Sequence, residues 1–229
     1  MPALITISIL MYSSLSAALT GTIYEKDSGR KKVLYTIEST ESESDGIYQR
    51  EMIFFDTTGK PVVKEWVKLK GTDVISYGAE FPRREEKGLI EVKDKTIHFS
   101  YTKDGKTKTA KESLVENFVV GLSMVPYIQS NWDKFISGEE INIRFGVLDR
   151  KDTVGLTFIR QKEKENKKGI VLAKMKASSF LIRALVDPLY LYFNEETKEL
   201  EYFIGRAKPK QLINGKWKDL DAETVYQNE

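Results

Sequence analysis

Hydrophobic and polar residues alternate along most of the chain from residue 19 onward. In the stretch 95–101, for example, Ile97, Phe99 and Tyr101 are separated by polar residues. Turn sequences such as Asp-Thr-Thr-Gly at 56–59 and Asp-Gly at 104–105 divide the runs. Alternation over runs of about 6–9 residues, bounded by Gly and Asp, is typical of antiparallel strands joined by hairpins. The pattern therefore predicts a meander of strands over the first half of the chain.

The period changes to three or four residues in the segment 117–137. Its apolar positions with this spacing are Val120, Met124, Tyr127, Ile128, Trp132 and Phe135. This spacing predicts a single helix from about Ser123 to Ser137, with Pro126 in the first turn and Gly138 ending it.

Alternation resumes after residue 140, where Ile141, Ile143, Phe145 and Val147 share one face of a predicted strand. A second short helix is predicted over 180–186, before Asp-Pro. Many antiparallel strands and two short helices predict a mainly β fold, with one antiparallel curved sheet or open barrel and the helices covering one face or mouth. We expect a single β-rich domain over 19–229.

Composition excludes several classes of site. The 229 residues include 36 basic and 34 acidic residues, so the net charge of +2 gives no sign of nucleic-acid binding. With no cysteine and one histidine, the chain has no thiol nucleophile, no disulfide and no Cys/His zinc site of its own. We expect no cofactor and no metal, and we expect His98 to be a half-exposed strand residue.

The amino-terminal segment has the composition of a signal peptide. Residues 1–24 carry no charged side chain, 3–12 are apolar, and small residues follow at 16–18. An apolar run of this length is too short for a membrane span of about 20 residues, so we predict a signal peptide over 1–18 and a periplasmic protein with no stable transmembrane span. Cleavage after Ser16 or Ala17 is an alternative, because these residues are also small, and an uncleaved anchor is another, because no Lys or Arg precedes the apolar run.

Three parts of the chain carry a resemblance to a known family. They are 21–24 with 33–35 and the hairpin 54–64; the segment 127–139 with 143–150; and the segment 181–190 with 200–205. In these parts the chain resembles a family of uncharacterised exported proteobacterial proteins. The resemblance implies export and a single β-rich domain, and it transfers no catalytic residue. Periplasmic lipoprotein carriers share a comparable plan of curved sheet and helix, as an analogy of fold alone.

Charged residues suggest two candidate contacts with a ligand. Arg144 and Arg150, with Arg160 on the next predicted strand, could form a patch that binds phosphate or carboxylate groups. The alternative is a solvated outer face paired with local acidic residues. Arg183 and Asp187 could hold a ligand head group, or they could form an ion pair between residues four apart on the second helix.

Aromatic residues suggest an apolar cavity between the sheet and the first helix. Its expected wall consists of Tyr127 and Trp132 from the helix and Phe145, Val147, Leu156 and Phe158 from two strands. The alternative is that these side chains fill an ordinary core.

Two classes of function fit these features. The first is a non-enzymatic periplasmic protein that binds an apolar or lipid-like ligand or an envelope component, and this is the function we expect. The second is a carboxylate-dependent hydrolase using Asp149, Asp152 and Asp187, which leave no recognisable sequence signature. A module that binds another envelope protein is a third possibility.

Overall fold

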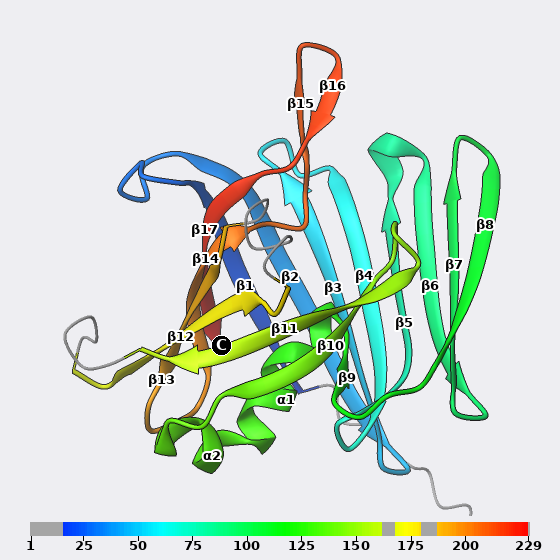
Figure 1. Cartoon of the computed structure of the whole chain (residues 1–229). Helices are drawn as coiled ribbons and strands as arrows, with labels where there is room; N and C mark the ends of the chain where they lie inside the picture. The colour runs from blue at the N-terminus through cyan, green and yellow to red at the C-terminus, as the bar shows by residue number, and fades with distance from the viewer. Residues whose placement is uncertain (1–15, 162–167, 180–186, 229) are drawn as a thin grey trace, which may run out of the picture.

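The computed structural model describes residues 16–161, 168–179 and 187–228, and in these residues the protein is mainly β (Figure 1). The elements, in chain order, are β1 (Ser16–Glu25), β2 (Val33–Ser44), β3 (Ile47–Asp56), β4 (Pro61–Lys70), β5 (Asp73–Phe81), η1 (Pro82–Arg84), β6 (Glu86–Lys93), β7 (Thr96–Lys103), β8 (Lys106–Ser113), β9 (Phe118–Val119), η2 (Gly121–Ser123), α1 (Met124–Ser130), α2 (Trp132–Ser137), β10 (Ile141–Val147), β11 (Asp152–Arg160), β12 (Ile170–Ala177), β13 (Leu189–Asn194), β14 (Leu200–Arg206), β15 (Gln211–Ile213), β16 (Lys216–Lys218) and β17 (Asp221–Asn228).

Fifteen of these strands form one sheet, in the order β8-β7-β6-β5-β4-β3-β2-β1-β17-β14-β13-β12-β11-β10-β9. Every neighbouring pair is antiparallel except β9 with β10. The first and last strands of the sequence pair along 19–25 and 222–228, and this pairing joins an amino-terminal half of the sheet to a carboxy-terminal half. The predicted meander is confirmed, since β2 to β8 follow one another in both sequence and space.

The sheet curves strongly but does not close by backbone hydrogen bonds, because β8 and β9 are its two edges. The carboxy-terminal half crosses in front of the amino-terminal half, and β10 and β11 run over β4 to β6 in Figure 1. Two glycines allow β6 of the first half and β10 of the second half to approach closely. A Cβ at Gly88 would lie 2.9 Å from Leu148, and one at Gly146 would lie 3.0 Å from Ile90. The structure therefore confirms a curved, open-barrel-like sheet with short helices.

The first predicted helix is present but broken in two, so the prediction of one continuous helix was wrong. Asn131 lies between α1 and α2 with φ −107° and ψ 21°, outside helical geometry. Its side-chain amide donates to the carbonyl of Tyr127 at 3.0 Å, and its own N–H bonds Ile128 three residues back, which interrupts the regular ladder. Pro126 lies in the first turn of α1, and Gly138 ends α2 with φ 93°, both as predicted. The second predicted helix, 180–186, lies outside the described residues.

Buried hydrophobic side chains form two clusters, one for each half of the sheet. The first cluster lies on the inner face of β1 to β7 and includes Ile37, Tyr77 and Phe99. The second lies between the helices and β10 to β13 and includes Trp132 and Phe158. A space remains between the two halves of the sheet, lined by members of both clusters.

Candidate ligand-binding cavity

A cavity of about 1170 Å³ occupies this space. It extends from the hairpin turns at Gly46 and Gly71, at the end of the fold nearer α1, to Lys210 and Asp219 at the base of the β15–β16 hairpin. Figure 1 shows the hairpin and the helices at opposite ends of the molecule.

The wall of the cavity is mostly apolar, and both halves of the sheet contribute to it. The inward-facing positions include Leu19, Ile37 and Met52 from the first half and Phe145, Leu156 and Leu191 from the second. Alternation along each strand explains the arrangement, since every second side chain points to the inner face. Phe145 and Leu156 are only partly buried because they face the cavity.

A buried polar group of three residues interrupts this wall. The hydroxyl of Tyr77 on β5 donates to Oε2 of Glu65 on β4 at 2.7 Å. Lys208, from the segment after β14, donates to the Tyr77 hydroxyl at 2.5 Å and lies 3.3 Å from Glu65. Burial, together with the Glu65 charge and hydrogen bond, holds the pKa of Tyr77 well above its usual value. Tyr77 is therefore a neutral donor, and Lys208 supplies the positive charge that compensates Glu65.

A second polar group lies where β6 begins. Glu86 accepts from the Tyr101 hydroxyl at 2.7 Å and pairs with Arg84 at 2.7 Å and with Lys103 at 3.2 Å. Although burial alone would raise its pKa, the hydrogen bond from Tyr101 and the charges of Arg84 and Lys103 lower the pKa of Glu86 overall. The Arg84 guanidinium also lies 4.1 Å from the centre of the Phe81 ring.

The base of the β15–β16 hairpin adds charges at the same end of the cavity. Asp219 pairs with Lys210 at 2.8 Å and with Arg206 at 2.7 Å. The hydrogen bond from Lys210, with the charges of Lys210, Arg206 and Arg84, lowers the pKa of Asp219 despite its partial burial. Because Arg84 lowers the pKa of both Asp219 and Glu86, the charges at the hairpin base interact electrostatically with those around Glu86.

The opposite end of the cavity carries a further charged group and is partly covered by α1. Glu41 accepts from the Tyr48 hydroxyl at 2.5 Å and pairs with Arg50 at 2.5 Å. Met124 and Gln129 of α1 line the cavity here, and the Gln129 side chain donates to the carbonyl of Lys198. The cavity thus has a mostly apolar middle, which the group of Glu65, Tyr77 and Lys208 interrupts, and charged residues toward both ends.

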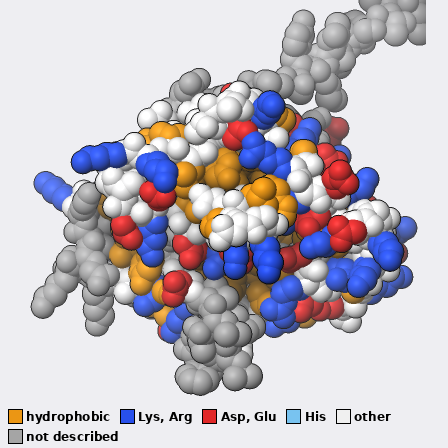
Figure 2. Space-filling view, turned by 90° about the horizontal axis from the view of Figure 1, so that it is seen from above, with side chains coloured by type: hydrophobic (Ala, Val, Ile, Leu, Met, Phe, Trp, Pro, Cys, Tyr) orange, Lys and Arg blue, Asp and Glu red, His pale blue; other side chains and the backbone are white. Residues whose placement is uncertain are grey.

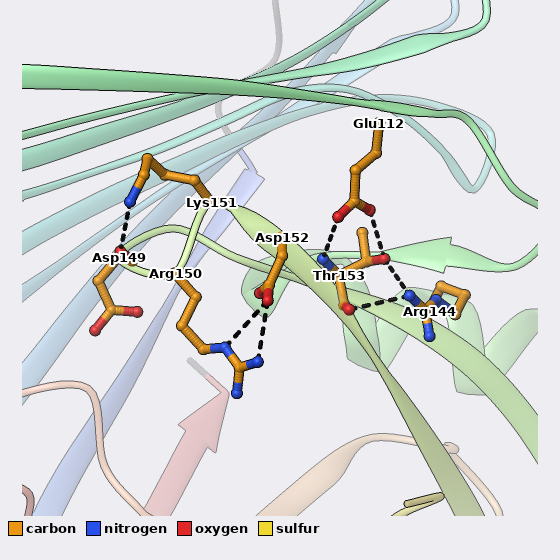
Figure 3. A network of polar contacts seen from close by, with 7 residues as sticks. All are labelled: Glu112, Arg144, Asp149, Arg150, Lys151, Asp152 and Thr153. Carbon is orange, nitrogen blue, oxygen red and sulfur yellow. Dashed lines mark hydrogen bonds and ion pairs between the residues drawn. The ribbon is translucent and has the colours of Figure 1, made fainter.

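The arginines of the predicted patch do not share one site: Arg144 and Arg150 each contact a different neighbouring residue (Figure 3). Arg144 donates to the carbonyl and hydroxyl of Thr153, whose own N–H and hydroxyl donate to Glu112 on β8. Arg150 pairs instead with Asp152 at 3.0 Å. The Glu112 contact joins the edge strand β8 to β11, so it holds the two halves of the sheet together.

The aromatic residues predicted to line a cavity divide into two sets. Phe145 lines the cavity. Trp132 and Phe158 are buried in the second hydrophobic cluster, and the Trp132 ring lies 5.8 Å from that of Phe135. Tyr127 is half-buried, and its hydroxyl donates to Asn117 at 2.7 Å. Their predicted role in ligand binding stays a prediction.

The acidic candidates also lie in different places. Asp149 and Asp187 are exposed residues at the cavity wall, whereas Asp152 carries the ion pair with Arg150. Arg183 lies outside the described residues, so its pairing with Asp187 stays a prediction. Arg160 donates to the carbonyl of Ile136 and is not part of the cavity wall. His98 is half-buried on β7, as expected.

Sequence reasoning missed the group formed by Glu65, Tyr77 and Lys208. Glu65 occupies an inward-facing position between Val63 and Val67, and a charged residue in the middle of an apolar alternation is the one signal that could have drawn attention to it. Nothing in the sequence pairs it with Lys208, which lies more than a hundred residues further along the chain.

Comparison with protein families, with characterised proteins and with solved structures gave no match. Over 16–161, 168–179 and 187–228, no helix has the length and apolar character needed to cross a bilayer. Within the same residues, no group of three or more His, Asp or Glu side chains is arranged to hold a metal ion.

Proposed function

We propose that the protein binds and carries an amphipathic, lipid-like molecule in the cavity between the two halves of its sheet. The observation that supports this proposal is the cavity itself, with a volume of about 1170 Å³ and an apolar middle. Small-molecule sites are typically about 300–1,000 Å³ and mostly apolar, so this cavity has room for a large ligand.

The physical argument rests on packing and transfer free energy. Protein interiors are packed at a density of about 0.75, so a space of this size is not an ordinary packing defect. Each methylene of an acyl chain moved from water into the apolar middle would contribute about 0.8 kcal/mol. Arg84 at one end, Arg50 at the other and Lys208 in the wall line the cavity and offer positive charges to a polar head group. The ligand class that fits is therefore a fatty acid, a phospholipid or a lipidated molecule.

The test uses the full chain without its first 18 residues and the environment-sensitive dye N-phenyl-1-naphthylamine. We expect dye fluorescence to rise with micromolar affinity, the melting temperature to increase with dye concentration, and palmitate or lysophospholipid to displace the dye. Native mass spectrometry of protein purified from a bacterial periplasm should show a co-purified ligand. Dye binding only to partly unfolded protein would contradict the proposal.

A matched pair of variants on β11 locates the site. Leu156 lines the cavity, whereas Ile159 is partly buried and is not part of the cavity wall. Leu156→Trp adds a large side chain inside the cavity and should weaken dye binding by about tenfold, a change of about 1.4 kcal/mol. Ile159→Trp should leave the affinity unchanged. Equal effects of the two variants would show that the dye binds elsewhere.

We further propose that this function belongs to the periplasm, after cleavage near Ala18. β1 begins at Ser16, so this cleavage would remove the pair of Ser16 with Glu41 and keep the continuous pairing of β1 with β2 from Leu19 to Ile23. Expressed with its own leader in a Gram-negative host, the protein should be recovered from the periplasm about 1.9 kDa lighter than the full chain. Mature protein whose sequence begins before Ser14 would contradict cleavage at this position.

A further inference from the structure

The β15–β16 hairpin stands apart from the main sheet. Its two strands pair only with each other, and in Figure 1 the hairpin projects from the end of the molecule opposite α1 and α2. Asn214 and Gly215 form its turn, with φ of 51° and 72°. Two consecutive residues with positive φ are characteristic of a tight type I′ turn, so the tip is a narrow two-stranded projection.

The tip of this hairpin exposes large apolar side chains. Leu212 is 59% exposed and Ile213 is 46% exposed, and these are the highest values among the exposed large hydrophobic residues of the described chain. Successive strand residues point to opposite faces, so Leu212 and Ile213 lie on opposite sides of the ribbon. Trp217 lies opposite Leu212 in the register and shares its face.

An apolar tip with two exposed faces fits a lipid surface better than a protein surface. A flat protein partner would cover one face of the ribbon and leave the other in water. Lipid head groups and acyl chains, by contrast, surround an inserted tip on all sides, and Trp is favoured at this interface.

The charges around the tip specify the kind of lipid. The hairpin itself, residues 211–218, includes two lysines, Lys216 and Lys218, and no acidic residue. Lys216 and Lys218 are exposed, and neither takes part in an ion pair among the described residues. A basic residue near an anionic bilayer contributes about 1 kcal/mol of attraction. Figure 2, which looks down on this end, shows hydrophobic atoms near the centre, with both basic and acidic side chains around them.

We propose that the β15–β16 hairpin docks the protein on an anionic lipid bilayer by inserting Leu212 and Ile213 between the head groups. The hairpin base carries Lys210 and Asp219, which also line the cavity. Docking would therefore bring one end of the cavity to the membrane surface. The use of that contact for ligand transfer rests on the proposed carrier function, whereas the docking itself does not.

The test is flotation of the full chain without its first 18 residues on vesicles of phosphatidylcholine with one quarter phosphatidylglycerol. Wild-type protein should float with these vesicles and bind pure phosphatidylcholine vesicles about tenfold more weakly, and added salt should reduce its binding. Leu212→Ser with Ile213→Ser should reduce binding at least about tenfold. Lys216→Gln with Lys218→Gln should reduce binding to the anionic vesicles only.

The matched control changes another adjacent pair of exposed apolar residues, Leu114 and Val115, which are 39% and 41% exposed. Leu114→Ser with Val115→Ser should bind vesicles as wild type does. Wild-type protein that stays unbound, or equal binding by the two Ser pairs, would overturn the docking proposal. All variants should retain dye binding in the cavity. If wild-type protein does not bind the dye, the carrier proposal is refuted, and the vesicle result still tests the docking proposal.

Discussion

Replacing Lys208 by Met tests whether the buried polar group stabilises the fold as its geometry indicates. Lys208 is the only cation paired with Glu65 among the described ion pairs, at 3.3 Å, and the Glu65 side chain is 6% exposed. Met keeps most of the length and apolar contacts of the Lys side chain but removes the charge. The variant would therefore leave a buried carboxylate with a hydrogen bond from Tyr77 and no compensating charge.

The expected cost follows from the burial of the pair. Removing one partner of a fully buried ion pair costs about 3–5 kcal/mol, and the loss of a cation over an aromatic ring adds about 0.5–2 kcal/mol. Lys208 lies 5.1 Å from the centre of the Tyr77 ring, but its side chain is 29% exposed. Solvent screening reduces the electrostatic part, so we expect a loss of about 2–3 kcal/mol.

Urea unfolding followed by tryptophan fluorescence and by circular dichroism measures this loss. For a slope of about 2–3 kcal/mol per M, the midpoint should fall by about 1 M. Glu65→Gln with Lys208→Met removes both charges and should recover at least half of the lost stability, because the buried carboxylate is gone. A midpoint unchanged in Lys208→Met, or additive losses in the double variant, would refute the reasoning.

Three further predictions concern stability. Trp132 is 6% exposed and packs against Phe135, so Trp132→Ala should cost about 3–5 kcal/mol, and an unchanged urea midpoint would contradict its burial. The pKa of Glu86 lies below its ordinary 4.5, so its stabilising contribution is complete above about pH 4.5 and is lost as the pH falls through the lower folded-state pKa. The melting temperature should fall less steeply below pH 4.5 in Glu86→Gln, and an equal slope would count against this assignment. A Cβ at Gly146 would lie 3.0 Å from Ile90, so Gly146→Val should cost about 1–3 kcal/mol and more than Gly146→Ala; two neutral variants would show that β10 moves freely.

The strands and turns of the amino-terminal half could be predicted from the sequence, because the information there is local. Alternation with period two, interrupted by turns such as Asp104-Gly105, determines which side chains share a face and where the chain reverses. The inward positions Ile97, Phe99 and Tyr101 follow from that pattern alone, and all three are buried. The same local information predicted the end of α2 at Gly138.

The break between α1 and α2 could not be read from periodicity, because the apolar spacing continues across it. The break depends on how the Asn131 side chain competes for backbone carbonyl groups, which the hydrophobic pattern does not encode.

Only the tertiary structure decided the site. Pairing of β1 with β17 and the crossing of β10 and β11 over β4 to β6 are long-range contacts, and they create the space between the two hydrophobic clusters. A pattern of inward-facing residues does not distinguish a filled interior from a cavity, because both require apolar side chains at the same positions. Trp132 and Phe145 therefore looked alike in sequence, although one is packed in a core and the other faces the cavity. The contact of Lys208 with Glu65 likewise depends on where two distant segments meet, and no local rule determines that.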